Sequence, residues 1–223
     1  MCLPVNFCYS PAMNNRNPWL DVPAEDYEGH MDHPDVDQLN FLSRLLADAL
    51  RDLRPEALAV PGSAMGTGFE HIDPEITLRV LAVDIQLAYL KILQDRHGDR
   101  LSGLETACAD LRNYEVDSNA FDLVFAALIF EYLEPEPLLQ KFTEWLRPGG
   151  WLVSVLQLPA KGHGKVSATP FEGVRVLEPI IHLLNPEDLK KLAASKGLGL
   201  VQENIEVAAA GKEFHVATFI REP

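Results

Sequence analysis

The feature that most limits how this chain can fold is an alternation of short apolar runs with helical patterns. The apolar runs have the length of strands and occupy residues 57–60, 79–83, 104–108, 121–127 and 151–156. Helical patterns follow several of them, at 66–72, 86–97 and 135–146. Strands that alternate with helices in this way pair in parallel and carry helices on both faces of one sheet. The central part of the chain is therefore predicted to be α/β.

Further elements flank this core on both sides. Apolar residues recur at helical spacing through 36–53, and Pro55 ends that pattern. In the helix predicted at 86–97, we expect Leu87, Leu90 and Leu93 to face the sheet. Near the other end, Asn185 followed by a proline predicts the start of a helix. Two β-rich runs, 199–207 and 213–220, are separated by a short turn and are predicted to pair antiparallel.

The chain is predicted to form one domain, because 223 residues fit one large domain better than two. Residues 1–35 are rich in Pro, Asn and Asp and lack periodicity, so they are expected to form an extended N-terminal arm or lid. The single domain then covers 36–223. Within it, 159–178 has no clear period and is expected to be a long loop or inserted cap.

Charge and cysteine content exclude several classes of function. There are 19 basic and 33 acidic side chains, a net charge of −14, which argues against nucleic acid or a membrane surface as partner. No apolar stretch approaches the roughly 20 residues of a membrane span, and 1–17 lacks a signal-peptide pattern, so a cytoplasmic location is expected. The three cysteines, Cys2, Cys8 and Cys108, suggest neither a disulfide framework nor a metal site.

Polar and small residues follow the first three predicted strands. A glycine-rich stretch runs from Gly62 to Gly68, Asp84 closes the second strand, and Asp110 follows the third. Ligands of open parallel sheets bind beyond the carboxyl ends of the strands. Small residues let a ligand approach the backbone, and a carboxylate can accept hydrogen bonds from ribose hydroxyls. The alternatives are plain tight turns for the glycines and helix or turn capping for both aspartates.

The stretch from about 57 to 156 resembles the core of the class I S-adenosylmethionine-dependent methyltransferases. The resemblance covers a little under half of the chain and rests on residues 58–66, 80–84, 108–111, 121–128 and 146–153. The last of these is the most telling, because it joins a helix end, the Pro148-Gly149-Gly150 turn and a buried strand. The resemblance implies a Rossmann-like, seven-stranded, mostly parallel sheet that ends in an antiparallel pair of strands.

The resemblance also implies S-adenosylmethionine as cofactor and assigns residues to it. Asp84 would hold the ribose, Asp110 and the Leu111 amide would read the adenine, and the glycine loop would lie against the methionine part. The cofactor-binding residues implied are Gly62, Ser63, Ala64, Gly66, Asp84, Ile85, Asp110, Leu111, Ala126 and Ala127, the last two beside the sulfonium.

Two positions depart from the family pattern. Val60 stands where the family usually has an acidic residue that helps to hold the cofactor's amine, and Ala64 replaces the second glycine. These departures leave open how the amine is held. They also allow an alternative in which the chain binds S-adenosylmethionine or S-adenosylhomocysteine without catalysing transfer.

Three segments are candidates for the acceptor side. Tyr27 and His30 of the arm are expected to approach the site, although Tyr27 could simply pack the arm onto the surface. Glu131 and Tyr132 follow the fourth strand; the alternative for Glu131 is an exposed acid at a helix start. Gln157 and the insert, with His163 and Phe171, could shape a pocket. His215, in a predicted strand, is expected to be packed or hydrogen-bonded rather than catalytic.

The sequence thus favours methyl transfer to an unidentified, small-molecule acceptor, since the acidic surface disfavours nucleic acid and no separate recognition domain is present. A non-catalytic binding protein and a protein methyltransferase remain alternatives. A nicotinamide-dependent dehydrogenase is disfavoured, because the loop lacks Gly-x-Gly-x-x-Gly spacing and the chain ends in a β-hairpin.

Overall fold

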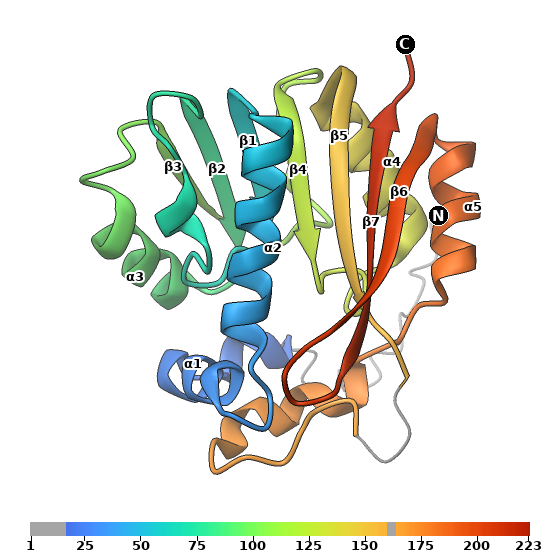
Figure 1. Ribbon diagram of the computed structural model, residues 1–223. Helices are drawn as coiled ribbons and strands as arrows, with labels where there is room; N and C mark the ends of the chain where they lie inside the picture. Colours follow the sequence, from blue (N-terminus) through green and yellow to red (C-terminus); the bar gives the residue numbers. More distant parts are fainter. Residues whose placement is uncertain (1–16, 160–163) are drawn as a thin grey trace, which may run out of the picture.

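A seven-stranded sheet forms the centre of the protein in a computed structural model that describes residues 17–159 and 164–223. The strand order is β3-β2-β1-β4-β5-β7-β6 (Figure 1). The strands are β1 (Ala57–Pro61), β2 (Arg79–Asp84), β3 (Leu104–Cys108), β4 (Phe121–Ala127), β5 (Leu146–Gln157), β6 (Leu198–Val207) and β7 (Glu213–Arg221).

The sheet has the mixed topology that the sequence predicts. β1 to β5 pair in parallel, for example Ala59 of β1 with Leu81 of β2 and Val124 of β4. β7 runs antiparallel to both β5 and β6. The first residue of β7 therefore lies at the same edge of the sheet as the carboxyl ends of the parallel strands. This confirms the predicted Rossmann-like fold with its C-terminal antiparallel pair.

Helices cover both faces of the sheet (Figure 1). Their bounds are α1 (Ala24–Asp32), α2 (Gln38–Leu53), α3 (Leu87–His97), α4 (Pro135–Trp145) and α5 (Pro186–Ser195), with 3-10 helices η1 (Pro18–Asp21), η2 (Phe69–His71) and η3 (Glu172–Ile180). Side chains of α2 and α3 pack into one apolar cluster against the sheet, and those of α4 and α5 into a second. The predicted cap of α5 is confirmed, because Asn185 Oδ1 accepts a hydrogen bond of 2.9 Å from the Glu187 amide.

The predicted N-terminal arm is not extended throughout, since α1 and η1 lie within it. The prediction missed α1 because the inward side of this helix is mostly polar or aromatic. That side consists of His30, Met31 and, one turn earlier, Tyr27. Such a face has helical spacing without the apolar stripe by which an amphipathic helix is recognised. Pro23 is the N-cap residue of α1 and has an extended backbone conformation, so the helix begins at the next residue.

Three other expectations need correction. β5 begins at Leu146, so the Pro148-Gly149-Gly150 segment belongs to the strand instead of preceding it. The predicted loop at 159–178 contains the start of η3. Leu87 is 53% exposed, whereas the neighbouring Tyr89 is fully buried. The buried side of α3 is therefore formed by Tyr89, Leu90 and Leu93. Leu87, the first residue of the helix, lies outside this buried side.

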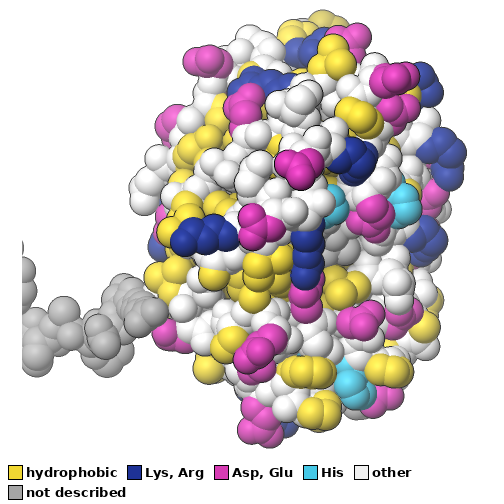
Figure 2. All heavy atoms as spheres, turned by 90° about the vertical axis from the view of Figure 1, so that its left-hand side faces the viewer, with side chains coloured by type: hydrophobic (Ala, Val, Ile, Leu, Met, Phe, Trp, Pro, Cys, Tyr) yellow, Lys and Arg dark blue, Asp and Glu magenta, His cyan; other side chains and the backbone are white. Residues whose placement is uncertain are grey.

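The molecular surface carries charges of both signs. Figure 2 shows Lys and Arg side chains scattered among Asp and Glu on the face that includes the β3 edge, without a continuous basic area on that face. Of the helices within 17–159 and 164–223, none combines the length and the apolar character required to cross a bilayer. In those same ranges, no group of three or more His, Cys, Asp or Glu side chains is arranged to hold a metal ion. Cys108 is an exposed free thiol; Cys2 and Cys8 lie outside the described residues.

Candidate active site

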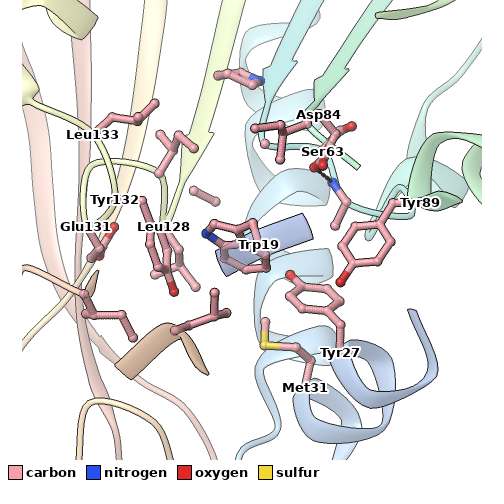
Figure 3. A pocket seen from close by; sticks show the side chains of 18 of the residues that line it. Trp19, Tyr27, Met31, Ser63, Asp84, Tyr89, Leu128, Glu131, Tyr132 and Leu133 are labelled. Atoms are coloured by element: carbon pink, nitrogen blue, oxygen red, sulfur yellow. Dashed lines mark hydrogen bonds between the residues drawn. The ribbon is translucent and has the colours of Figure 1, made fainter. Parts of the chain in front are cut away.

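A cavity lies along the carboxyl edge of the sheet, where the fold rule places ligands. Its walls come from the residues after β1, β2, β3 and β4, from the end of β5, and from η3. Residues 17–32, which we call the N-terminal segment, form the remaining side. Figure 3 shows Trp19 of this segment between Asp84 and Ser63 on one side and Tyr132 and Glu131 on the other.

Asp84 organises the loop that follows β1. One carboxylate oxygen, Oδ2, accepts a hydrogen bond of 2.9 Å from the Ala64 amide, and Oδ1 accepts one of 2.8 Å from the Gln86 amide. Burial raises the pKa of the Asp84 carboxyl, and these two amide bonds oppose that rise. Asp84 therefore holds the turn before α3 and does not cap that helix, whose N-cap residue is Gln86. A carboxylate has about four lone-pair sites, so the Asp84 carboxyl keeps accepting capacity for a ligand's hydroxyl group.

The loop after β1 adopts a backbone conformation that favours glycine at four positions, Gly62, Ala64, Gly66 and Gly68. Gly62 has a φ of 69° and Ala64 a φ of 46°, the left-handed region that costs an L-residue roughly 1–2 kcal/mol. The Ala64 methyl packs in a buried cluster with Met65 and Tyr89. The bond to Asp84 and this packing together hold a non-glycine residue in a glycine conformation.

Eight of the ten residues assigned to the cofactor line the cavity: Gly62, Ser63, Ala64, Asp84, Ile85, Asp110, Leu111 and Ala127. Gly66 and Ala126 do not. A Cβ at Gly66 would lie 3.1 Å from the Leu93 side chain, so this glycine allows the loop to approach α3 closely. Ala126 is fully buried on the sheet face opposite to that of Ala127, because side chains alternate along a strand.

Asp110 lies at the cavity wall but already has partners. Its Oδ1 accepts a hydrogen bond of 3.0 Å from the Arg112 amide, and the Arg112 guanidinium holds the pKa of its carboxyl below the ordinary value. The turn-capping alternative is thus also present. Leu111, beside it, is buried and contributes an apolar surface.

The residues present fit a polar ligand at this end of the cavity. Ser63 Oγ is buried and has no hydrogen-bond partner among the residues that the structure describes. A buried hydroxyl without a partner is unfavourable by about 1–3 kcal/mol, which a ligand's polar atom would relieve. Gly62 adds room, since a Cβ there would come within 3.1 Å of Ile129 Cδ1. Val60, without a carboxyl group, lines the cavity as an apolar residue.

The N-terminal segment is fastened to the domain on two sides. Toward α3, the Gln86 side-chain amide donates to the carbonyls of Trp19 and Val22, and the Tyr89 hydroxyl donates to Val22 at 2.9 Å. Toward the insert, Asp26 Oδ2 accepts a bond of 2.8 Å from the amide of Gly173. These contacts keep the segment over the carboxyl edge of the sheet.

Tyr27 and His30 both line the cavity, as predicted. Tyr27 lies between two aromatic rings, with centroids 5.9 Å from Trp19 and 5.5 Å from Tyr89. Burial raises the pKa of its phenol, so the group stays protonated. The His30 Nδ1 atom lies 2.9 Å from Thr169 Oγ1. Burial and the nearby Lys212 ammonium lower the pKa of His30 to about 4, so the imidazole is neutral at pH 7.

Glu131 and Tyr132 also line the cavity. The Glu131 side chain is only 3% exposed, which excludes the alternative of a solvated helix-start acid. Its Oε1 accepts a bond of 2.7 Å from the Gln157 amide, whereas Oε2 has no partner within the described part of the chain. Burial raises the pKa of the carboxyl to about 7. Tyr132 stacks edge-on against Trp19, with ring centroids 5.0 Å apart.

The four remaining candidates have different places in the structure. Gln157 lines the cavity. Phe171 packs against α1 at Gly29, where a Cβ would collide with its ring, and therefore positions the helix instead of lining the cavity. His215 is buried and its Nε2 lies 2.8 Å from Glu203 Oε2, as expected for a hydrogen-bonded histidine. His163 lies outside the described residues.

Sequence reasoning missed several residues that line the cavity, notably Trp19, Gln38, Tyr89 and Lys212. A tryptophan in an otherwise polar segment was a usable signal for Trp19. Tyr89 lies four residues before Leu93, which is helical spacing, but it was not among the residues predicted to face inward. Lys212 gave no signal, because a lysine in a predicted turn is ordinarily solvated.

Comparisons with known proteins bear on the family and the fold. Residues 61–154 match the family model of the methyltransferase domain. No curated protein sequence matches the chain. Among solved structures, the N-methyltransferase NodS of Bradyrhizobium japonicum, in complex with S-adenosyl-L-homocysteine, is similar with a TM-score of 0.63, 18% identity, and coverage of 90% of this chain and 98% of that one.

Two further structures share the fold. The 1,6-didemethyltoxoflavin-N1-methyltransferase of Burkholderia thailandensis has a TM-score of 0.63 and 18% identity, covering 96% of this chain and 94% of that one. The [4+2]-cyclase SpnF has a TM-score of 0.65 and 14% identity, covering 84% and 82%. Residues 61–154 are thus similar to the methyltransferase domain family, and the chain shares the fold of these solved structures, with its own seven-stranded sheet.

Proposed function

We propose that this chain transfers a methyl group from S-adenosylmethionine to a small-molecule acceptor held beneath the N-terminal segment. The observation that carries the proposal is one cavity with two distinct ends. Asp84 and the loop after β1 stand at one end, and the unpartnered carboxyl oxygen of Glu131 stands at the other. Aromatic rings of Trp19, Tyr27 and Tyr132 lie between them.

The cofactor end would hold S-adenosylmethionine by hydrogen bonds and shape. The remaining accepting capacity of Asp84 suits the ribose hydroxyls, and Asp110 and Leu111 suit the adenine. The loop from Gly62 to Ala64 and the buried Ser63 hydroxyl suit the methionine part. When bound, the cofactor supplies a methyl group on a positively charged sulfur and leaves as the neutral thioether S-adenosylhomocysteine.

The acceptor end would align and desolvate the nucleophile. Holding two reactants in the right geometry contributes roughly 7–11 kcal/mol to such a reaction. The N-terminal segment acts as a lid whose aromatic side chains exclude water. An acceptor that must lose a proton would transfer it to Glu131, whose pKa of about 7 is suited to a general base at neutral pH.

A small acceptor is favoured over a protein side chain because the cavity is covered. Trp19 lies across its centre (Figure 3), and side chains of η3 also line it. The similar 1,6-didemethyltoxoflavin-N1-methyltransferase carries the small molecule 1,6-didemethyltoxoflavin in its structure. Because the similar SpnF is a cyclase, turnover has to be measured directly.

The first test is calorimetric titration with S-adenosylhomocysteine. Asp84→Asn is expected to weaken binding at least tenfold, about 1.4 kcal/mol, since it removes charge and one acceptor oxygen from the ribose end. Asp73→Asn is the matched control, because Asp73 also accepts a backbone amide bond, at 2.9 Å from Glu75, but lies away from the cavity. Failure of the unsubstituted protein to bind would overturn the cofactor assignment.

The second test is turnover of methyl-labelled S-adenosylmethionine on a panel of small amines, phenols and carboxylates. On an acceptor that must lose a proton, Glu131→Gln should lower the rate about 10²- to 10⁴-fold at pH 7 while S-adenosylhomocysteine affinity stays unchanged. Tight cofactor binding with no transfer to any member of the panel would favour the non-catalytic alternative.

A further inference from the structure

Lys212 is a buried lysine without a carboxylate partner. It ends the turn between β6 and β7, is only 2% exposed, and lines the cavity. Its ammonium donates one hydrogen bond, of 3.2 Å, to the carbonyl oxygen of Lys165. Within residues 17–159 and 164–223 it forms no ion pair, and burial lowers the pKa of its ammonium. The position is therefore unfavourable for a charge unless something outside the described chain compensates it.

Lysines elsewhere in the protein show how unusual this is. Lys190 pairs with Glu187 and Glu203, and Lys141 pairs with Glu115, although these lysines are more exposed. A buried ammonium without a counter-charge costs several kcal/mol. In a chain of net charge −14, carboxylates are abundant, so the lack of an ion pair at Lys212 among the described residues is a local property of this end of the cavity.

A second lysine and a neutral histidine lie at the same end. Lys165 also lines the cavity, and its ammonium donates to the carbonyl of Ile181 at 2.6 Å. His30 is close enough for the Lys212 ammonium to lower its pKa. The group is therefore cationic, and its hydrogen-bonding capacity is mostly that of donors.

The sheet places this group far from the ribose end. Lys212 directly precedes β7, whose first residues lie at the carboxyl edge because β7 is antiparallel. Asp84 ends β2, and the strand order puts three strands between β2 and β7. Four strand spacings of about 4.8 Å amount to roughly 19 Å. Glu131 follows β4 and belongs to the acceptor side of the cavity, and Lys212 marks the far edge of that side.

We propose that Lys212, with Lys165 and His30 beside it, binds an oxyanion of the methyl acceptor, a carboxylate or a phosphate. This inference rests on the proposed function, because it assumes that the acceptor occupies this end of the cavity. The anion would fix one end of the acceptor at Lys212, and the nucleophilic atom would then lie toward Glu131. Selection for anionic acceptors follows, since a neutral molecule would leave the ammonium uncompensated.

The test measures the binding of two simple anions and one neutral analogue by NMR titration, observing the signals of the protein. Benzoate and inorganic phosphate are titrated separately into protein saturated with S-adenosylhomocysteine, and benzamide serves as the neutral counterpart of benzoate. The variants are Lys212→Met, Lys165→Met, and the control Lys91→Met, which removes an exposed lysine from α3, away from the cavity.

The expected result is that at least one anion binds the unsubstituted protein and that Lys212→Met raises its Kd at least tenfold. Lys165→Met should raise the Kd less, Lys91→Met should leave it unchanged, and benzamide should not distinguish the variants. Binding of benzoate alone identifies a carboxylate acceptor, and binding of phosphate alone identifies a phosphorylated one. Lys165 is exposed, so its variant is a second test that does not depend on a substitution in the core.

Two results would overturn the inference while leaving the proposed function intact. One is S-adenosylhomocysteine binding to all variants with no anion binding, or with anion binding that ignores Lys212. The other is a tenfold loss of S-adenosylhomocysteine affinity in Lys212→Met, which would assign the ammonium to the cofactor's own carboxylate. Failure of the unsubstituted protein to bind S-adenosylhomocysteine instead contradicts the proposed function itself.

Discussion

At the scale of single residues, the cavity joins groups whose environments move their pKa values in opposite directions. Burial raises the pKa of the Glu131 carboxyl to about 7 and lowers that of the His30 imidazole to about 4. Both groups are therefore close to neutral at slightly acidic pH, in contrast to their ordinary behaviour in water. Such displaced pairs of titratable groups are concentrated at functional sites.

Glu131 makes a prediction about stability and pH. Because its folded pKa of about 7 lies above the ordinary value of 4.5, the folded state keeps a proton that the unfolded state releases. The contribution of this proton to the free energy of unfolding is complete below pH 4.5 and is lost as the pH rises through 7. At about 1.4 kcal/mol per pKa unit, the unfolding free energy of Glu131→Gln relative to the unsubstituted protein should rise by about 2 kcal/mol between pH 5.5 and pH 8.

Urea denaturation at the two pH values measures this difference. Glu134→Gln is the matched control, since it makes the same chemical change at an exposed position three residues away. An equal rise in the control, or no rise in Glu131→Gln, would contradict the assignment of the raised pKa to the buried carboxyl.

At the scale of elements, α1 and η1 depend on tertiary contacts. α1 has nine residues, which is shorter than the roughly 12–15 residues at which an isolated helix becomes marginally stable in water. Its place is set by Gly29, which admits the ring of Phe171, and by the hydrogen bonds that Gln86 and Tyr89 donate to the N-terminal segment. The segment is therefore the element most open to local unfolding.

Tyr89→Phe tests how strongly α3 holds this segment. The substitution removes the hydroxyl that donates to the Val22 carbonyl and leaves the buried ring in place. A net loss of about 1 kcal/mol should speed release of S-adenosylhomocysteine about fivefold, because the segment must open for the ligand to leave. Stopped-flow fluorescence of the cavity tryptophan, Trp19, can follow the release. Tyr114→Phe, outside the cavity, should leave the rate unchanged.

At the scale of the whole molecule, the sheet and its cover differ in stability. β1 and β4, in the middle of the sheet, are almost completely buried and join the two apolar clusters. The cavity lies outside this core, between the carboxyl edge and the N-terminal segment. Ligand binding is therefore expected to change the dynamics of the cover much more than those of the sheet.

Hydrogen exchange tests this division. Amides in 17–32 should exchange faster than those in 121–127 in the absence of ligand. A ligand at 100 times its Kd stabilises the bound form by about 2.7 kcal/mol, so S-adenosylhomocysteine should slow exchange in 17–32 by up to about 100-fold. Local exchange in 135–145, on the far face of the sheet, should change little. Equal slowing in both segments would mean that the N-terminal segment does not open separately.

The sequence by itself determined the strands of the sheet, the helices from α2 onward, and most of the residues that line the Asp84 end of the cavity. The reason is that these features depend on local patterns: periodicity gives the elements, and residues that directly follow strands, such as Gly62, Asp84 and Asp110, come to one edge whatever the details of packing. The family resemblance over 57–156 reflects the same local signals.

Only the tertiary structure decided the cover and the acceptor end. Trp19, Tyr89 and Lys212 are distant in sequence and line one cavity because η1, α3 and the β6–β7 turn all reach it. Burial also decided the state of Glu131, since a glutamate near a helix start is charged in water but largely protonated below pH 7 inside this cavity. Desolvation depends on every neighbour at once, and no local pattern in the chain records it.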